Sequence, residues 1–154
     1  MSTFLLALLI GIVAGSRSMT APALVCWAVR FGYFDLSGTW LAFLGNVWVR
    51  WILTLFALAE LVADQLPTTP SRTQPVGFGA RIVTGALSGA AIGTGRGTPV
   101  AGLVAGIVGA IVGTLGGHAF RARLASALGS DRPAAFIEDA AAIGGALLIG
   151  LALR

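Results

Sequence analysis

Gly15-Ser16-Arg17-Ser18-Met19-Thr20-Ala21-Pro22 is a polar, proline-containing stretch inside an otherwise apolar segment over residues 3–33. An arginine flanked by serines is costly at membrane depth unless other groups satisfy it. Pro22 suits the first turn of a helix, and Thr20 is a candidate N-cap. We therefore expect a first helix that is broken near residues 15–22. One long helix with a proline kink is the alternative.

The composition indicates an integral membrane protein. Of the 154 residues, 56% are apolar and only 10% are charged, whereas a soluble domain is typically about 25% charged. The mean hydropathy is +0.90. We expect one all-α membrane domain over residues 1–154, located in the inner (cytoplasmic) membrane. The start of the chain lacks the basic region of a signal peptide, so residues 1–15 are expected to be mature structure.

The net charge of +4 would suit a nucleic-acid-binding protein if the chain were soluble. The arginines are instead scattered over loops and helix ends, and they form no basic run. No nucleic-acid partner is therefore expected, and membrane lipids are the expected surroundings.

Four further apolar segments are each close to the length that crosses a bilayer, which is about 20 helical residues. They cover residues 49–66, 77–95, 99–118 and 133–152. With the first segment they predict about five transmembrane helices and place the two termini on opposite sides. Residues 35–48 mix aromatic and polar side chains, which is typical of a membrane–water boundary, so an interfacial helix is expected there. The arginines divide evenly between the two sides and give no orientation.

Two of these segments carry glycines at regular helical spacing. One stripe covers residues 85–93 and the other residues 102–117. Small residues on one helix face allow close packing in lipid, where such contact is a main source of helix association. We expect the two helices to pack tightly against each other, and we expect a homodimer through the same stripes.

The chain tracing brings five titratable residues toward one membrane face: Glu60, Asp64, His118, Glu138 and Asp139. Glu60 and Asp64 are four residues apart, so they share a helix face. A carboxylate inside an apolar run must be protonated or find a partner. The candidate partners of Glu60 are Arg17, Arg81, His118 and Arg121.

Several functions fit these residues. Carboxylate oxygens suit a hard cation, for which the candidate ligands are Glu60, Asp64, Glu138 and Asp139. A histidine side chain suits a proton relay, for which His118 is the candidate. Ser16, Arg17 and Ser18 beside a half-helix N-terminus suit an anionic headgroup or substrate. Alternatively, the same charges form salt bridges that fix the helix packing. The full candidate set is Ser16, Arg17, Ser18, Glu60, Asp64, His118, Arg121, Glu138 and Asp139.

Four motifs together resemble a bacterial membrane family, domain-of-unknown-function family 4126. They are Ala14-Gly-Ser-Arg-Ser, Glu60-Leu-Val-Ala-Asp-Gln-Leu-Pro with Ser71 after it, His118-Ala-Phe-Arg-Ala-Arg, and Phe136-Ile-Glu-Asp. Arg121 stands where members of the family carry a lysine, and Thr69 where they often carry an aspartate. The threonine at position 69 in place of an aspartate weakens a metal site built on the loop that contains this residue. The resemblance implies an integral membrane protein, gives no activity, and suggests that the polar residues belong to one set.

Two classes of function follow. The first is a small ion- or proton-linked transporter or channel-like protein with a polar site between its helices. The second is a non-transporting structural or lipid-binding protein whose charges pair off. An enzyme is not expected, because the chain carries no serine–histidine or metalloprotease motif. No cofactor is expected either, and a bound cation or lipid is the open alternative.

Overall fold

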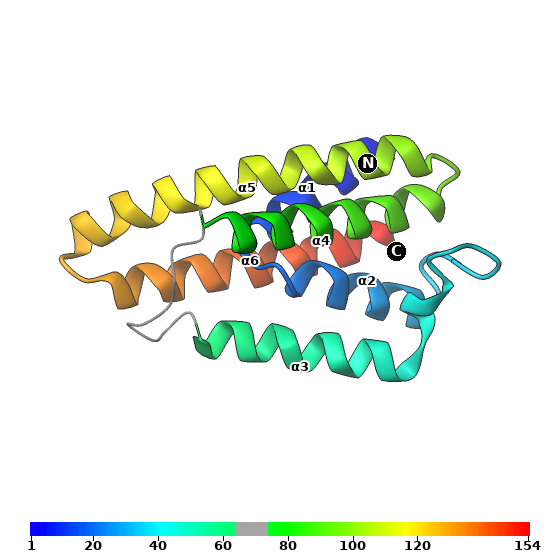
Figure 1. Cartoon of the computed structure of the whole chain (residues 1–154), viewed down its shortest axis with the longest axis horizontal. Coiled ribbons are helices and arrows are strands. Elements are labelled where there is room, and N and C mark those ends of the chain that lie inside the picture. The colour runs from blue at the N-terminus through cyan, green and yellow to red at the C-terminus, as the bar shows by residue number, and fades with distance from the viewer. Residues whose placement is uncertain (64–73) are drawn as a thin grey trace.

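The chain folds into helices, shown in a computed structural model that describes residues 1–63 and 74–154 (Figure 1). The described elements are α1 (Thr3–Ser16), α2 (Thr20–Arg30), the 3-10 helix η1 (Ala42–Gly45), α3 (Val47–Ala63), α4 (Pro75–Thr94), α5 (Pro99–Leu128) and α6 (Asp131–Leu153). The all-α prediction is confirmed. Asp64, the predicted end of the second segment at 66, and the loop that follows lie outside the described residues.

The first apolar segment is two helices. α1 ends at Ser16, residues 17–19 are not helical, and α2 begins at Thr20. Arg17 has an extended backbone, with φ −138° and ψ 101°, and this conformation ends α1. The N-cap position of α2 is Met19, which offers no capping side chain. The prediction of Thr20 as N-cap is therefore wrong by one residue.

α1 and α2 form a hairpin that turns back inside the bundle. Gly11 lies against Gly106, and Gly15 lies against Ala110, so α1 runs parallel to α5. α2 then returns along α6, where Leu24 lies near Gly150. We call the end of the bundle that holds both termini the terminal end, and the opposite end the distal end. The hairpin enters from the terminal end and its tip, residues 17–19, points toward the distal end (Figure 1).

The hairpin corrects the predicted placement of the termini on opposite sides. The Arg96 guanidinium, in the α4–α5 connection, donates a hydrogen bond to the Met1 carbonyl at 3.5 Å. Both ends of the chain lie at the same end of the bundle (Figure 1). The physical reason is length: the 14 residues of α1 extend about 21 Å, which is short of a hydrocarbon core about 30 Å thick.

Within the described residues, three helices are long and apolar enough to cross a membrane: Pro75–Thr94, Pro99–Ala127 and Pro133–Leu153. The predicted count of about five is not confirmed. α5 was expected over residues 99–118 but continues to Leu128, because residues 119–128 are rich in Ala, Arg and Leu, which favour helix. It ends where Gly129 adopts φ +66°, a conformation that glycine takes without steric cost.

The predicted interfacial helix over residues 35–48 is reduced to the four residues of η1. The connection around it folds over the terminal end of the bundle. Some of its apolar side chains join the core: Phe34, Leu36, Leu41 and Leu44 are buried, whereas Trp40 and Phe43 are exposed. To bury these side chains the connection must bend several times, which a continuous helix cannot do. Gly32 and Gly38 supply two of these bends, each with φ +75°.

The striped glycines bring three backbones together. A Cβ at Gly85 would lie 2.8 Å from the Gly106 carbonyl oxygen, and one at Gly89 would lie 2.8 Å from the Gly106 Cα. Farther along α5, Gly109 and Gly113 face Leu8 and Ile12 of α1 instead of α4. These glycines are thus occupied by contacts within one chain. A homodimer remains a prediction.

Candidate functional site

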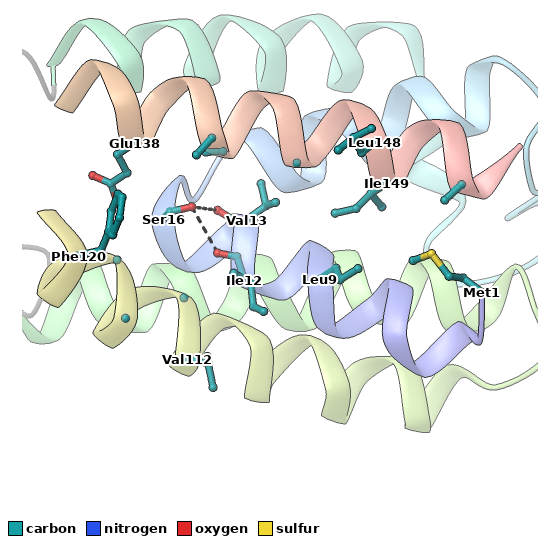
Figure 2. Close-up of a pocket in the computed structure, with 17 residues that line it drawn as sticks. Met1, Leu9, Ile12, Val13, Ser16, Val112, Phe120, Glu138, Leu148 and Ile149 are labelled. Atoms are coloured by element: carbon teal, nitrogen blue, oxygen red, sulfur yellow. Dashed lines mark hydrogen bonds between the residues drawn. The ribbon is translucent and has the colours of Figure 1, made fainter. Parts of the chain in front are cut away.

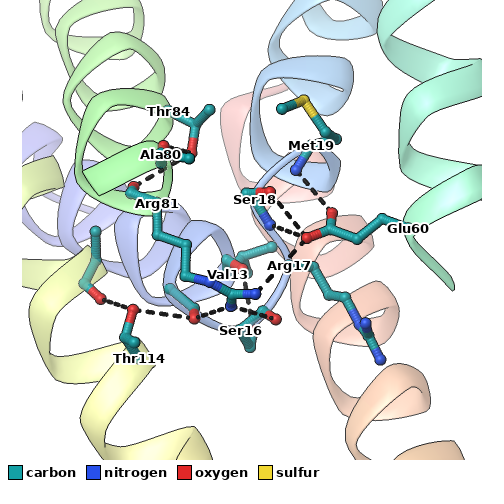
Figure 3. A network of polar contacts seen from close by, with 12 residues as sticks. Val13, Ser16, Arg17, Ser18, Met19, Glu60, Ala80, Arg81, Thr84 and Thr114 are labelled. Atoms are coloured by element: carbon teal, nitrogen blue, oxygen red, sulfur yellow. Dashed lines mark hydrogen bonds and ion pairs between the residues drawn. The ribbon is translucent and has the colours of Figure 1, made fainter. Parts of the chain in front are cut away.

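The tip of the hairpin brings two helix ends together inside the bundle (Figure 3). At this point α1 exposes its last carbonyl groups and α2 exposes its first N–H groups, and neither set has a partner within its own helix. Along α6 the tip lies level with Asp139, which is eight residues, or about 12 Å, from the distal start of that helix.

The carboxylate of Glu60, on α3, holds the N-terminal side of α2. The backbone N–H and the hydroxyl of Ser18 donate to Oε1 at 2.9 and 2.8 Å. The backbone N–H of Met19 donates to Oε2 at 2.9 Å. A negative charge is favoured here because the helix dipole is positive at the N-terminus. Glu60 therefore occupies the position that an anion would take at this helix end.

Arg81 of α4 and Thr114 of α5 hold the C-terminal side of α1. The Arg81 guanidinium donates to the carbonyls of Gly15 and Ser16 at 2.8 and 3.1 Å. The Thr114 hydroxyl is 3.1 Å from the Gly15 carbonyl and 2.8 Å from that of Ala110 in its own helix. A cation complements the negative end of the helix dipole. Arg81 also lies 4.0 Å from Glu60, so it joins the two halves of the tip.

Arg17 itself is fully buried, and it forms an ion pair with Asp139 of α6. Asp139 is 8% exposed. A buried charge requires such a partner, because an unpaired charge in an apolar interior is prohibitively costly. The convergence follows from the hairpin: because the first segment turns back, Arg17 reaches the depth of Asp139.

The other predicted residues lie around this tip. The Ser16 hydroxyl donates to carbonyls of its own helix, at 3.0 Å to Val13 and 3.4 Å to Ile12. Glu138 is 4% exposed, and its carboxylate lies 4.0 Å from the Arg121 guanidinium. His118 is on the exposed face of α5. The structure thus brings Arg17, Ser18, Glu60 and Asp139 together, with Glu138 and Arg121 as a neighbouring pair.

Among residues 1–63 and 74–154, no group of three or more His, Cys, Asp or Glu side chains is arranged to hold a metal ion. Asp64, the fourth candidate ligand, lies outside this part of the chain. In place of a carboxylate ring, the ion pairs Arg17–Asp139, Arg81–Glu60 and Arg121–Glu138 match three guanidinium groups with three carboxylates. The charges of these six groups cancel when all of them are ionised.

Sequence reasoning missed two of the groups that hold the tip. Arg81 is predicted as a partner of Glu60, which it approaches to 4.0 Å, but its hydrogen bonds to the α1 carbonyls and those of Thr114 are not predicted. Arg81 carried a signal, since it is a charge inside an apolar segment. Thr114 carried none, because a threonine within a transmembrane helix commonly bonds the carbonyl four residues before it, as Thr114 also does.

The long apolar helices, buried ion pairs and opposed half-helices define a class: a polytopic helical protein of the membrane type. Within that class the chain belongs to the family described as domain of unknown function (DUF4126), whose model matches residues 4–152. The match confirms the domain-of-unknown-function family that the four motifs suggest; the bacterial and membrane character of that family stays a prediction. No curated protein and no solved structure matches the chain.

Proposed function

We propose that this protein is a small transporter or channel-like protein of the inner membrane, and that a small anion passes the hairpin tip in exchange with Glu60. One observation carries the proposal: the N–H groups at the start of α2 are held by a side-chain carboxylate from another helix. A carboxylate on a side chain can be protonated or can move away, whereas a backbone cap cannot.

The chemistry resembles a general device of secondary transporters, in which half-helix N-termini inside the membrane face anionic groups of the substrate. Protonation of Glu60 removes its charge and weakens its hold on Ser18 and Met19. Those donors, together with Arg81 at 4.0 Å, then favour another anion. Proton binding and anion binding at the tip are thereby linked.

Other charged groups near Glu60 set the electrostatics of this exchange. Arg81 comes from α4, and Arg17 in the tip is neutralised by Asp139 from α6. Protonated Glu60 would leave the tip with one excess positive charge, which an anion would cancel. The proposal requires no catalysis and no cofactor. It includes a homodimer, because a chain of 154 residues is short for enclosing a complete pathway.

The second candidate is a non-transporting structural protein in which the tip is a lock. The cancelling charges favour it, as does the complete burial of Arg17. Buried ion pairs can fix one arrangement of helices without contributing net stability. In this candidate Glu60 never leaves Ser18 and Met19.

Proteoliposome flux separates the two candidates. Purified protein is reconstituted, and proton uptake is followed with an internal pH dye under gradients of chloride, nitrate, phosphate and acetate. We expect at least one anion to drive proton uptake in the wild-type protein and Glu60→Gln to lose it. Gln is nearly isosteric with Glu but carries no titrating charge.

Asp35→Asn is the matched control for removing one carboxylate. Asp35 is exposed, and hydrogen bonds from Ser37 hold its pKa below its usual range. Its substitution should leave the flux unchanged. Absence of anion-driven proton uptake in folded wild-type protein would overturn the transport proposal in favour of the lock. Equal uptake by Glu60→Gln would overturn anion exchange at Glu60.

A further inference from the structure

An apolar groove of about 600 Å³ runs along the bundle between α1, α5 and α6 (Figure 2). Apolar side chains from the three helices line it, among them Leu9, Val112 and Ile149. It has one polar end, where Glu138 lies beside Phe120 and Ser16, and it extends from there toward Met1 (Figure 2). The groove is separate from the Glu60 carboxylate of the hairpin tip.

Glycines keep this groove open. Gly116 of α5 and Gly145 of α6 both line it. A Cβ at Gly116 would meet nothing within 4 Å, and one at Gly145 would meet only a Val13 methyl at 3.8 Å. Unlike the glycines that join α4 to α5, these do not serve close backbone contact. They leave space that a membrane would fill with lipid.

The polar end of the groove carries both signs of charge. Glu138 lines it, and Arg121 lies 4.0 Å from that carboxylate. The hydroxyl of Ser16 donates to carbonyls of its own helix, so it is already committed as a donor. An ionised carboxylate has about four acceptor sites, so Glu138 can accept from a second charged donor while it is paired with Arg121. An ammonium group is such a donor, and a phosphate beside it complements Arg121.

The groove is long enough for a fatty chain. From Glu138 to Ala152, two lining residues of α6, the helix rises about 21 Å. This exceeds half of a hydrocarbon core about 30 Å thick. One long apolar chain with a zwitterionic head would therefore complement both the groove and its polar end.

We propose that the groove binds a phospholipid with a primary ammonium headgroup, that is, phosphatidylethanolamine. One acyl chain lies along α6, the ammonium donates to Glu138, and the phosphate lies at Arg121. Phosphatidylcholine would fill the groove equally well, but its quaternary ammonium has no N–H to donate. The preference for one headgroup therefore tests the role of Glu138. Retention of any lipid in the groove tests whether the glycines leave room for an acyl chain.

Native mass spectrometry of protein released from nanodiscs tests the proposal. The nanodiscs contain equal amounts of phosphatidylethanolamine and phosphatidylcholine. We expect one retained lipid, enriched in phosphatidylethanolamine by about tenfold or more, as a charged hydrogen bond supports. Glu138→Gln should keep the retained lipid but abolish the enrichment.

Gly145→Leu should remove the retained lipid, because its side chain fills the groove. Gly144→Leu is the matched control: it is the neighbouring residue, it does not line the groove, and a Cβ there meets nothing within 4 Å. Gly116→Leu replaces Gly145→Leu if the latter does not fold. Equal retention by the filled variants and the control would overturn the proposal. So would absence of headgroup preference in the wild type, or a second copy of the chain in place of lipid.

Discussion

Two neighbouring regions, the middle of α1 and the hairpin tip that follows it, are held by opposite means. Gly11 lies against Gly106 of α5, and the atoms nearest to it there are backbone atoms. Immediately afterwards, Arg17 and its neighbours are held by charged or polar groups from α3, α4, α5 and α6. The glycine contact fixes where α1 lies by shape. The tip is held by hydrogen bonds and ion pairs, and a proton or an ion that binds there can change them.

The difference teaches where function can reside in so small a chain. Close backbone packing is insensitive to pH and to small solutes, because it contains nothing that titrates or binds. The tip contains titratable and charged groups near the middle of the bundle. Each of the following variants tests one side of this contrast.

The largest effect is expected at the tip. Arg17→Met leaves Asp139 buried without its ion-pair partner, which typically costs about 3–5 kcal/mol. The double variant Arg17→Met/Asp139→Leu should recover most of that loss, because neither charge is then buried. The measurement is equilibrium unfolding in mixed detergent–SDS micelles, followed by circular dichroism.

Arg30→Met serves as the control for Arg17→Met, because Arg30 is an exposed arginine at the end of α2. It should change the free energy of unfolding by about 0.5 kcal/mol or less. Equal effects at Arg17 and Arg30 would contradict the buried ion pair.

A smaller effect is expected at the glycine contact. Gly106→Ala places a methyl group against the Gly85 carbonyl, and overpacking of this kind costs about 1–3 kcal/mol. The same unfolding measurement applies. Gly116→Ala is the matched control on the same helix, since its methyl meets nothing within 4 Å, and it should be neutral or stabilise by up to about 1 kcal/mol. If the two substitutions behave alike, α4 and α5 are not in close contact.

The smallest effect is expected at Thr114, where the two regions meet. Thr114→Val keeps the shape but removes the hydroxyl that lies within hydrogen-bond distance of Gly15 and Ala110. One hydrogen bond contributes about 1 kcal/mol. Thr84→Val is the control, because its hydroxyl bonds only carbonyls of its own helix, those of Ala80 and Arg81. A larger loss for Thr84→Val than for Thr114→Val would contradict the role of Thr114 at the tip.

The sequence was sufficient to predict helices and the position of the break, because apolar runs and Pro22 are local signals. It was not sufficient to predict that α2 turns back. A break looks the same in a sequence whether the chain continues or reverses, and the outcome depends on Arg17 reaching Asp139. The prediction of an interfacial helix over residues 35–48 was wrong for a related reason. Burial of Phe34 and Leu36 in the core outweighs the local preference for helix.

The candidate site was predicted in its residue types and only partly in its pairing. Arg17, Arg81, His118 and Arg121 are the predicted side-chain partners of Glu60, and of these Arg81 lies 4.0 Å from it. In the structure Glu60 holds backbone N–H groups of residues 18 and 19, a partner that no side-chain pattern reveals. Thr114 was missed because its second contact, to Gly15, joins helices far apart in the sequence.

The most direct test of the central claim is whether water reaches the tip but not the glycine contact. Cys26 is the one cysteine of the chain, so Cys26→Ala gives a background for single cysteines. Ser18→Cys reports on the tip. Ser88→Cys, a fully buried serine of α4 between Gly85 and Gly89, reports on the packed region. Both variants are treated in liposomes with a small charged methanethiosulfonate and again after denaturation.

We predict that Ser18→Cys is labelled in the folded protein, that Ser88→Cys is not, and that both are labelled when denatured. Labelling at residue 18 should also fall when the anion that drives proton uptake is added. If Ser18→Cys resists labelling as completely as Ser88→Cys in the folded protein, the tip is a dry lock and the transport proposal is contradicted.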